Sequence, residues 1–163
     1  METMPQTGTV RWLGLRPARR AAMEVVQQVR ASPEHGLAGD RYGGRSGKRQ
    51  VTLLQAEHVA AVAAMLRRPA LDYALLRRNI VIAGLNLVAL KGRRFRVGEA
   101  VLETTGLCHP CSRMEEALGP GGYNLMRGHG GITARVLAGG LIRVGDRAEL
   151  LAGSEAAAAG LPA

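Results

Sequence analysis

The sequence predicts a mainly β fold with inserted helices (α+β) and a β-barrel architecture, and three observations lead to this class. Glycine accounts for 22 of the 163 residues and separates many short apolar runs, as is typical of strands joined by turns. Aromatic residues make up only 3% of the chain against 47% hydrophobic residues, so the core must consist mainly of aliphatic side chains. Helical periodicity is confined to a few segments, most of them in the first half of the chain.

Short apolar and β-branched runs predict the strands. They lie at 9–15, 50–54, 79–82, 93–97, 101–104, 132–137, 141–144 and 147–151. The last two are expected on either side of a turn at Gly145 and Asp146. Helical spacing predicts helices at 55–67, at 72–77 with Asp72 as N-cap, and at 112–118. Segment 23–30 is ambiguous, and propensity alone favours a helix there.

The length and the net charge of the chain limit the number of domains and the kind of partner that it can have. One domain is expected over 1–151, followed by a small-residue tail at 152–163 that is predicted to be disordered. The net charge of +9 implies an anionic partner, such as a phosphate, an oxyanion, nucleic acid or a lipid head group, without choosing among them. No secretory leader opens the sequence and no apolar run approaches about 18 residues, which predicts a cytoplasmic protein that does not enter a membrane.

The segment 101–115 holds both cysteines, Cys108 and Cys111, and is the main candidate for a functional site. A strand leads into it, and a short helix is expected to begin just after Cys111. A thiol at a helix start lies near unpaired N–H groups and the positive end of the helix dipole, which favour thiolate over thiol. Arg113 and His109 add positive charge on either side.

The Cys-x-x-Cys pair is compatible with four interpretations. A structural zinc site needs about four ligands, and His35, His58 and His129 are not spaced as a second half-site. A thioredoxin-type redox pair expects the motif at the start of a long helix, whereas the predicted helix here is short. Two small residues packed in a turn would need no chemistry at all. The setting best fits a reactive thiol with a neighbour, used for group transfer or to bind a soft metal.

Two further segments offer candidate anion ligands. Arg78 and Asn79 lie between a helix end and a strand start, where a guanidinium and an amide can hold an anion by charge-assisted hydrogen bonds. The same pattern also suits a solvated helix end. The loop at Gly130 and Gly131 presents backbone N–H groups without side chains in the way. Because strand ends far apart in sequence can share one rim of a barrel, we expect these segments to meet around the cysteines in one basic pocket that includes Arg113.

Seven sequence blocks, taken in order, carry a resemblance to a known family. They are Gly36-Leu-Ala-Gly-Asp40, Gln50-Val-Thr-Leu-Leu54 with Glu57, Arg77-Arg-Asn-Ile-Val81, Leu90-Lys-Gly-Arg-Arg-Phe-Arg-Val-Gly98, Cys108-His-Pro-Cys111, Gly130-Gly-Ile-Thr-Ala-Arg-Val136 and Gly140-Leu-Ile-Arg-Val-Gly-Asp146. Together they resemble the MOSC domain, named for the C-terminal domain of molybdenum cofactor sulfurases. The match runs from about residue 9 to residue 151. The chain resembles a stand-alone bacterial member, without the aminotransferase-like domain of the sulfurases or the N-terminal extension of the amidoxime-reducing relatives.

This resemblance implies a barrel-like fold similar to the pyruvate kinase β-barrel domain, and it implies that segment 23–30 is extended. It also implies molybdenum cofactor (molybdopterin) binding or sulfur handling through a cysteine that aligns with Cys111, with Cys108 as a supporting thiol. Pro110 stands where the reductase relatives commonly have arginine. In one version of the resulting hypothesis, Cys111 ligates molybdenum. The pterin phosphate is then held by Arg78, Asn79, Arg113, Gly130 and Gly131.

Other functions remain open at this point. In a second version of the hypothesis, Cys111 carries sulfane sulfur as a persulfide and passes it to an acceptor, which implies a sulfur-donor or redox protein as partner. A thiol redox protein that uses both cysteines is one alternative. A basic barrel that binds nucleic acid is another; it predicts aromatic stacking platforms among the basic residues, and Phe95 is the only clear case.

Overall fold

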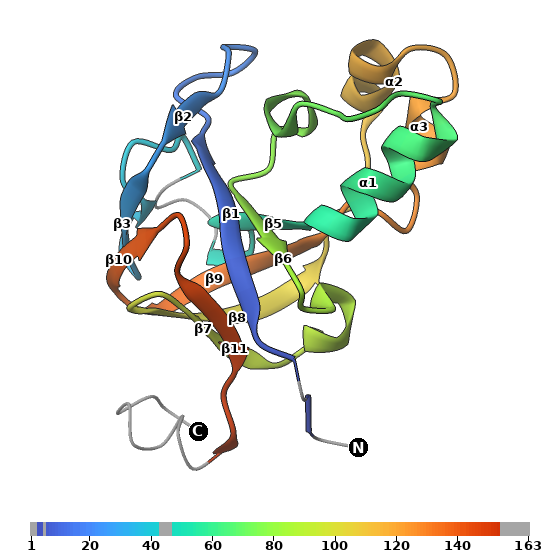
Figure 1. Ribbon diagram of the computed structural model, residues 1–163. Helices are drawn as coiled ribbons and strands as arrows, with labels where there is room; N and C mark the ends of the chain where they lie inside the picture. The colour runs from blue at the N-terminus through green and yellow to red at the C-terminus, as the bar shows by residue number, and fades with distance from the viewer. Residues whose placement is uncertain (1–2, 5, 43–46, 154–163) are drawn as a thin grey trace.

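The computed structural model describes residues 3, 4, 6–42 and 47–153 of the chain (Figure 1). The strands within this part are β1 Gly8–Leu15, β2 Glu24–Val26, β3 Gln28–Ser32, β4 Gly36–Leu37, β5 Val51–Gln55, β6 Ile80–Ala83, β7 Arg94–Val97, β8 Ala100–Leu107, β9 Ile132–Ala138, β10 Gly140–Arg143 and β11 Arg147–Leu150. The α-helices are α1 Ala56–Met65, α2 Ser112–Leu118 and α3 Gly122–Met126, and the 3₁₀ helices are η1 Gly47–Arg49, η2 Tyr73–Leu76 and η3 Leu87–Leu90. The predicted class, mainly β with inserted helices, is confirmed. The predicted disorder of the tail concerns 154–163, which lie outside the described residues.

Seven strands close into a mixed barrel. Hydrogen-bonded neighbours follow the order β11-β7-β8-β9-β5-β6-β1, and the pairing of β1 with β11 closes the ring. Most neighbours are antiparallel, whereas β5 and β6 are parallel. Parallel neighbours need a long connection, and α1 and η2 lie in the one between these two strands. This connection returns the chain to the barrel at Arg78 and Asn79, beside the end of β1.

The segment that was ambiguous in sequence is extended. It forms β2, which pairs with β1, and β3, which forms a second sheet in the order β10-β3-β4. The extended conformation implied by the family resemblance is therefore confirmed, and the helix favoured by propensity is wrong. Val25, Val26 and Val29 have β-branched side chains that suit strands, and pairing with neighbours decides between the two states.

The turn at Gly145 and Asp146 is present, but it does not join the strands of a hairpin. β10 pairs with β3 in the small sheet, whereas β11 pairs with β7 and β1 in the barrel. The main chain of this turn bonds to β1, with the Gly145 N–H donating to the Val10 carbonyl at 2.8 Å. The turn therefore carries the chain from one sheet to the other.

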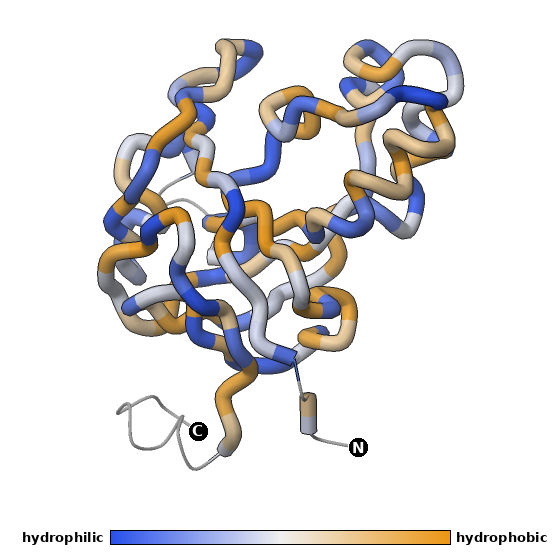
Figure 2. Tube along the Cα trace, in the orientation of Figure 1, coloured by the Kyte–Doolittle hydropathy of each residue, from blue (hydrophilic) through white to orange (hydrophobic). Residues whose placement is uncertain are grey.

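Aliphatic side chains fill the barrel, as the composition predicted. Phe95, fully buried on β7, is the largest side chain of this core, and the others are mostly leucine, valine, isoleucine and alanine. Figure 2 shows apolar and polar residues alternating along much of the trace, as strands with one face on the core require. The core positions the strand ends that carry the site.

The three α-helices and η2 gather near one end of the barrel, where they bury a second apolar cluster (Figure 1). Val62 of α1, Leu76 of η2, Met114 of α2 and Met126 of α3 belong to this cluster. It ties the helix that follows the cysteines to the segment that leads into Arg78. The site therefore lies between the barrel core and this helical cluster.

The short helices follow local capping, partly as predicted. Asp72 caps η2 by accepting a hydrogen bond from the Ala74 N–H at 3.0 Å, as expected. The helix α3 was not among the helices predicted from the sequence. Its start is held from outside, because the Glu115 carboxylate of α2 accepts bonds from the N–H groups of Gly121 and Tyr123. These two bonds lower the pKa of Glu115 below its ordinary value. Over the described residues, no helix is both long and apolar enough to cross a bilayer.

Candidate functional site

An open pocket of about 280 Å³ lies where the cysteine segment meets the end of β1, the loop after β4 and the start of β6. It is lined by Arg16, Arg19, Arg41, Tyr42, Arg49, Thr52, Arg77, Arg78, Cys108, His109, Cys111, Arg113 and Met114. Seven of these residues are arginines, and none of the described residues that line it is acidic. The pocket is therefore suited to an anion.

The two cysteines have different surroundings. β8 ends at Leu107, and the next residue, Cys108, is buried with only 6% of its surface exposed. Its N–H donates to the Gly131 carbonyl at 2.8 Å, which fixes this part of the main chain. Cys111 is exposed and occupies the N-cap position of α2, where its carbonyl accepts from the Met114 N–H. Both are free thiols, and Cys111 is the one that a reagent or partner can reach.

Arg78 lines the pocket and carries a buried donor without a partner. The residue is 7% exposed; its Nε donates to the Gly130 carbonyl at 3.0 Å and its Nη1 to the Leu76 carbonyl at 2.8 Å. Its Nη2 is buried and has no hydrogen-bond partner. A buried guanidinium N–H without a partner is costly, and an oxyanion in the pocket would satisfy it. Two main-chain bonds thus orient this side chain, and its Nη2 stays without a partner.

The loop at Gly130 and Gly131 fixes the positions of Arg78 and Cys108. A Cβ at Gly130 would collide with the Cys108 carbonyl oxygen, and a Cβ at Gly131, whose φ is +85°, would collide with the Leu53 carbonyl oxygen. Only glycine allows the loop to approach β5 and the cysteine segment this closely. The carbonyls of both glycines accept hydrogen bonds from Arg78 and Cys108, respectively. Their role in the structure is to hold the pocket residues in place.

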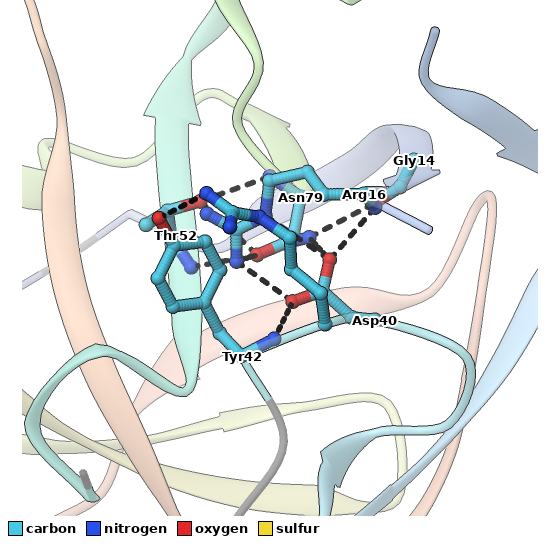
Figure 3. Close-up of polar contacts among 7 residues, drawn as sticks. Gly14, Arg16, Asp40, Tyr42, Thr52 and Asn79 are labelled. Atoms are coloured by element: carbon cyan, nitrogen blue, oxygen red, sulfur yellow. Dashed lines mark hydrogen bonds and ion pairs between the residues drawn. The ribbon is translucent and has the colours of Figure 1, made fainter. Parts of the chain in front are cut away.

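A buried polar network forms the floor of the site (Figure 3). Arg16 and Asp40 form a bidentate ion pair, with Nε–Oδ1 at 3.0 Å and Nη2–Oδ2 at 2.9 Å, and their side chains are 9% and 0% exposed. The Asn79 amide oxygen accepts from Arg16 and Thr52, and its nitrogen donates to Asp40 and to the Gly14 carbonyl. Asn79 thereby joins β1, β5 and the loop after β4.

This network keeps the carboxyl group of Asp40 ionised. Burial would raise the pKa of this carboxyl, but the hydrogen bonds and charge of Arg16, together with the Asn79 amide, lower it below its ordinary value of 3.8. The carboxylate neutralises Arg16, which lines the pocket. The other pocket arginines are left to attract a ligand.

The positive field of the pocket acts on Arg77. Burial lowers the pKa of this guanidinium, and the charges of Arg113, Arg16 and Arg41 lower it further. Arg77 has a left-handed backbone with φ of +57°, and its Nη1 donates to the Ala21 carbonyl at 2.6 Å. Cations that repel one another in this way are held together by the fold, and an anion would relieve the repulsion.

Tyr42 adds an aromatic ring beside these charges. The guanidinium carbons of Arg16 and Arg41 each lie 4.3 Å from its ring centroid. Arg41 also donates to the tyrosine hydroxyl at 2.6 Å. Such cation–π contacts stabilise closely spaced arginines and orient them at the pocket.

The structure brings the segments that were assigned to the site together, but not in equal roles. The assigned residues that line the pocket are Arg78, Cys108, Cys111 and Arg113. Asn79, Gly130 and Gly131 are buried and do not line it. Asn79 was expected to hold an anion directly, and its amide is instead occupied by protein partners. The glycines were expected to offer N–H groups, whereas their carbonyls make the bonds that matter here.

Several pocket residues were missed by sequence reasoning. The clearest are Arg16, Arg19, Arg41, Tyr42, Arg49 and Thr52. Arg41 and Tyr42 lie in a glycine-rich stretch, and nothing in the sequence distinguished them from solvated residues. Arg16 and Arg19 follow the first strand and carry no motif. Charge density near a strand end was the one available signal.

The structure bears on two of the alternatives, nucleic-acid binding and a structural zinc site. Phe95, the expected stacking platform for nucleic acid, is fully buried and cannot contact a base, so that expectation is wrong. Among the described residues, no group of three or more His, Cys, Asp or Glu side chains is placed to hold a metal ion.

Comparisons with known proteins bear on the fold and the family. The chain is similar to the crystal structure of the YuaD protein from Bacillus subtilis, with a TM-score of 0.77 and 18% identity over 88% of this chain and 95% of that one. It is also similar to YiiM from Geobacillus stearothermophilus, with a TM-score of 0.73 and 16% identity over 89% and 75% of the two chains. YiiM from Escherichia coli gives a TM-score of 0.67 and 21% identity over 92% and 71%. At these identities the likeness concerns the fold.

No curated protein sequence matches the chain significantly. The family model of the MOSC domain matches residues 21–149, which include the barrel strands from β5 to β9, nearly all of β11, the cysteine segment and most of the pocket arginines. The chain belongs to the MOSC domain family.

Proposed function

We propose that this MOSC domain binds the molybdenum cofactor in the arginine-lined pocket and uses Cys111 as its functional thiol. The observation that carries the proposal is the combination of an exposed thiol with a buried, unpartnered guanidinium N–H in one pocket wall. A thiolate is a ligand that molybdenum accepts, and a pterin phosphate is an anion that arginines bind bidentately. The residues present therefore fit the group.

In this proposal the arginines have distinct tasks. Arg78 would donate its free Nη2 to a phosphate oxygen, and Arg113 and Arg77 would supply charge on the same side. Arg16, already paired with Asp40, would hold the floor of the pocket and contribute little net charge. The bound cofactor would supply redox or sulfur chemistry at its metal, and the protein would bind and orient it.

A second version is favoured by the exposure of Cys111, which a partner protein can reach. Here Cys111 is a sulfur carrier. Its thiolate attacks the terminal sulfur of a donor persulfide, R–S–SH; a bond forms between that sulfur and Cys111 Sγ, the donor S–S bond breaks, and the donor leaves as a thiolate. The step consumes no oxidant or reductant. Either version requires a free thiol. We therefore propose that the protein works in a reducing compartment such as the cytoplasm.

The test is metal, pterin and sulfane-sulfur analysis of protein purified from its own host. Cys111→Ala should abolish molybdenum retention or cyanide-labile sulfur, whereas Cys108→Ala should reduce it less because Cys108 is buried. Iodoacetamide should label Cys111 in the folded wild type and leave Cys108 unmodified until denaturant is added. Retained molybdenum with pterin supports the first version, and labile sulfur without metal supports the second. If Cys108→Ala is the more damaging change, the assignment of the functional thiol is wrong.

A further inference from the structure

We infer that the physiological ligand of this site carries an apolar body beyond its anionic group, and that this body lies in a groove next to the arginine pocket. The groove has a volume of about 370 Å³. Its apolar wall consists of Ala22, Met23, Ala74, Leu75 and Ala117. The inference rests on the sulfur-carrier version of the proposed function, in which no cofactor phosphate occupies the arginine pocket, and it names the class of molecule as a small amphiphilic oxyanion.

Continuity with the arginine pocket is the first argument. Arg77 and Arg113 line both the pocket and the groove. The two spaces are therefore adjacent, and a ligand whose charged group lies among the arginines has its body next to the groove. The pKa of Arg77 is already lowered by burial and by neighbouring cations, so the boundary between the two spaces attracts negative charge.

The chemistry of the groove wall is the second argument. Leu75 is 39% exposed, although it lies on η2 beside the buried Leu76, and it faces a wall that is otherwise made of alanines and a methionine. Small side chains leave room, and an exposed leucine among them gains by being covered. Glu116 is the one acidic lining residue, and its carboxylate lies 3.9 Å from the guanidinium of Arg20.

The groove is also held in shape. Arg77 Nη1 donates to the Ala21 carbonyl at 2.6 Å, which ties the segment carrying Ala22 and Met23 to the end of η2. The same guanidinium that meets the anion thus positions the apolar wall. A ligand with an oxyanion at one end and a hydrocarbon body at the other satisfies both surfaces at once.

The experiment measures the affinity of the full chain for n-alkyl phosphates, from methyl to pentyl phosphate, by calorimetry at low ionic strength. Charge is constant along this series, so the dependence on chain length reports the groove alone. Affinity should rise by about twofold per methylene, which is what half-burial of a methylene gives, and therefore by on the order of tenfold across the series. The dependence should level off once the groove is filled.

Variants separate the two spaces. Leu75→Asn should flatten the dependence on chain length and leave methyl phosphate binding unchanged. Val88→Asn is the matched control, because Val88 is 40% exposed on η3 and lines neither space. Met23→Gln repeats the test with a nearly isosteric change, should Leu75→Asn alter the melting temperature. Arg78→Lys should weaken every member of the series by the same factor.

The outcomes distinguish this inference from the proposed function. If methyl phosphate binds but affinity does not rise with chain length, the groove does not take the ligand body, while the anion pocket stands. A rise that persists unchanged in Leu75→Asn and Met23→Gln also overturns the inference. If methyl phosphate fails to bind at millimolar concentration, the anion pocket itself is refuted, and the inference falls with it.

Discussion

Replacing Arg78 by lysine tests the central feature of the site at constant net charge. Arg78 uses Nε and Nη1 for main-chain carbonyls at 3.0 and 2.8 Å, and its buried Nη2 has no hydrogen-bond partner. Lysine has one nitrogen, which cannot bond both carbonyls in this geometry and still face a ligand. We therefore expect Arg78→Lys to lose ligand affinity although the charge remains.

The magnitude follows from the bonds that change. One lost hydrogen bond between a charged donor and an oxyanion corresponds to about 1.5–3 kcal/mol, or a loss of about 10- to 100-fold in affinity. Loss of one main-chain contact should lower the free energy of unfolding by a further ~1 kcal/mol. A mere change at a solvated helix end would cost a few tenths of a kcal/mol in either quantity.

The assay is calorimetric titration with inorganic phosphate at low ionic strength, together with thermal unfolding of each variant. Arg147→Lys provides the matched control, because this arginine on β11 is mostly exposed, pairs with Glu149 and does not line the pocket. Binding is measured well below the melting temperatures so that all variants are folded. Affinity of Arg78→Lys within twofold of the wild type, or an equal loss in Arg147→Lys, would refute the reasoning.

Three further predictions concern the framework of the site. Asp40→Asn should lower the free energy of unfolding by about 3 kcal/mol or more in denaturant titrations, because Arg16 is then buried without its counterion, and a loss below about 1 kcal/mol would contradict this. Burial, and then the neighbouring His129, lower the pKa of His58 in the folded protein below 6.5. The unfolded chain therefore binds more protons at this residue, and the melting temperature should fall as the pH drops from about 7.5 to 5.5. His58→Gln should remove much of that fall. Gly130→Ala should destabilise the fold and weaken phosphate binding because of a backbone collision, whereas Gly47→Ala, with open space around its Cβ, should do neither; equal melting temperatures would argue against the close approach.

The sequence by itself determined the fold class and most of the longer elements. Strand alternation, the α1 periodicity and the Asp72 cap depend on residues within one short segment, so they can be recognised without knowing the fold. The cysteine segment was also evident, because a Cys-x-x-Cys between a strand and a helix is a local pattern. For segment 23–30, local propensity pointed to a helix, and only the resemblance to a family pointed to strands.

Tertiary structure alone decided what each site residue does. Arg16 meets Asp40 across 24 positions and Asn79 across 63, and no local pattern records such a pairing. Asn79 looked like a ligand because amides bind anions, but three segments converge on it and occupy every polar atom of its side chain. Gly130 and Gly131 looked like donors, yet their carbonyls hold Arg78 and Cys108. Which polar atom is left free for a ligand depends on which others the fold has already satisfied, and that is a property of the closed barrel, not of any one segment.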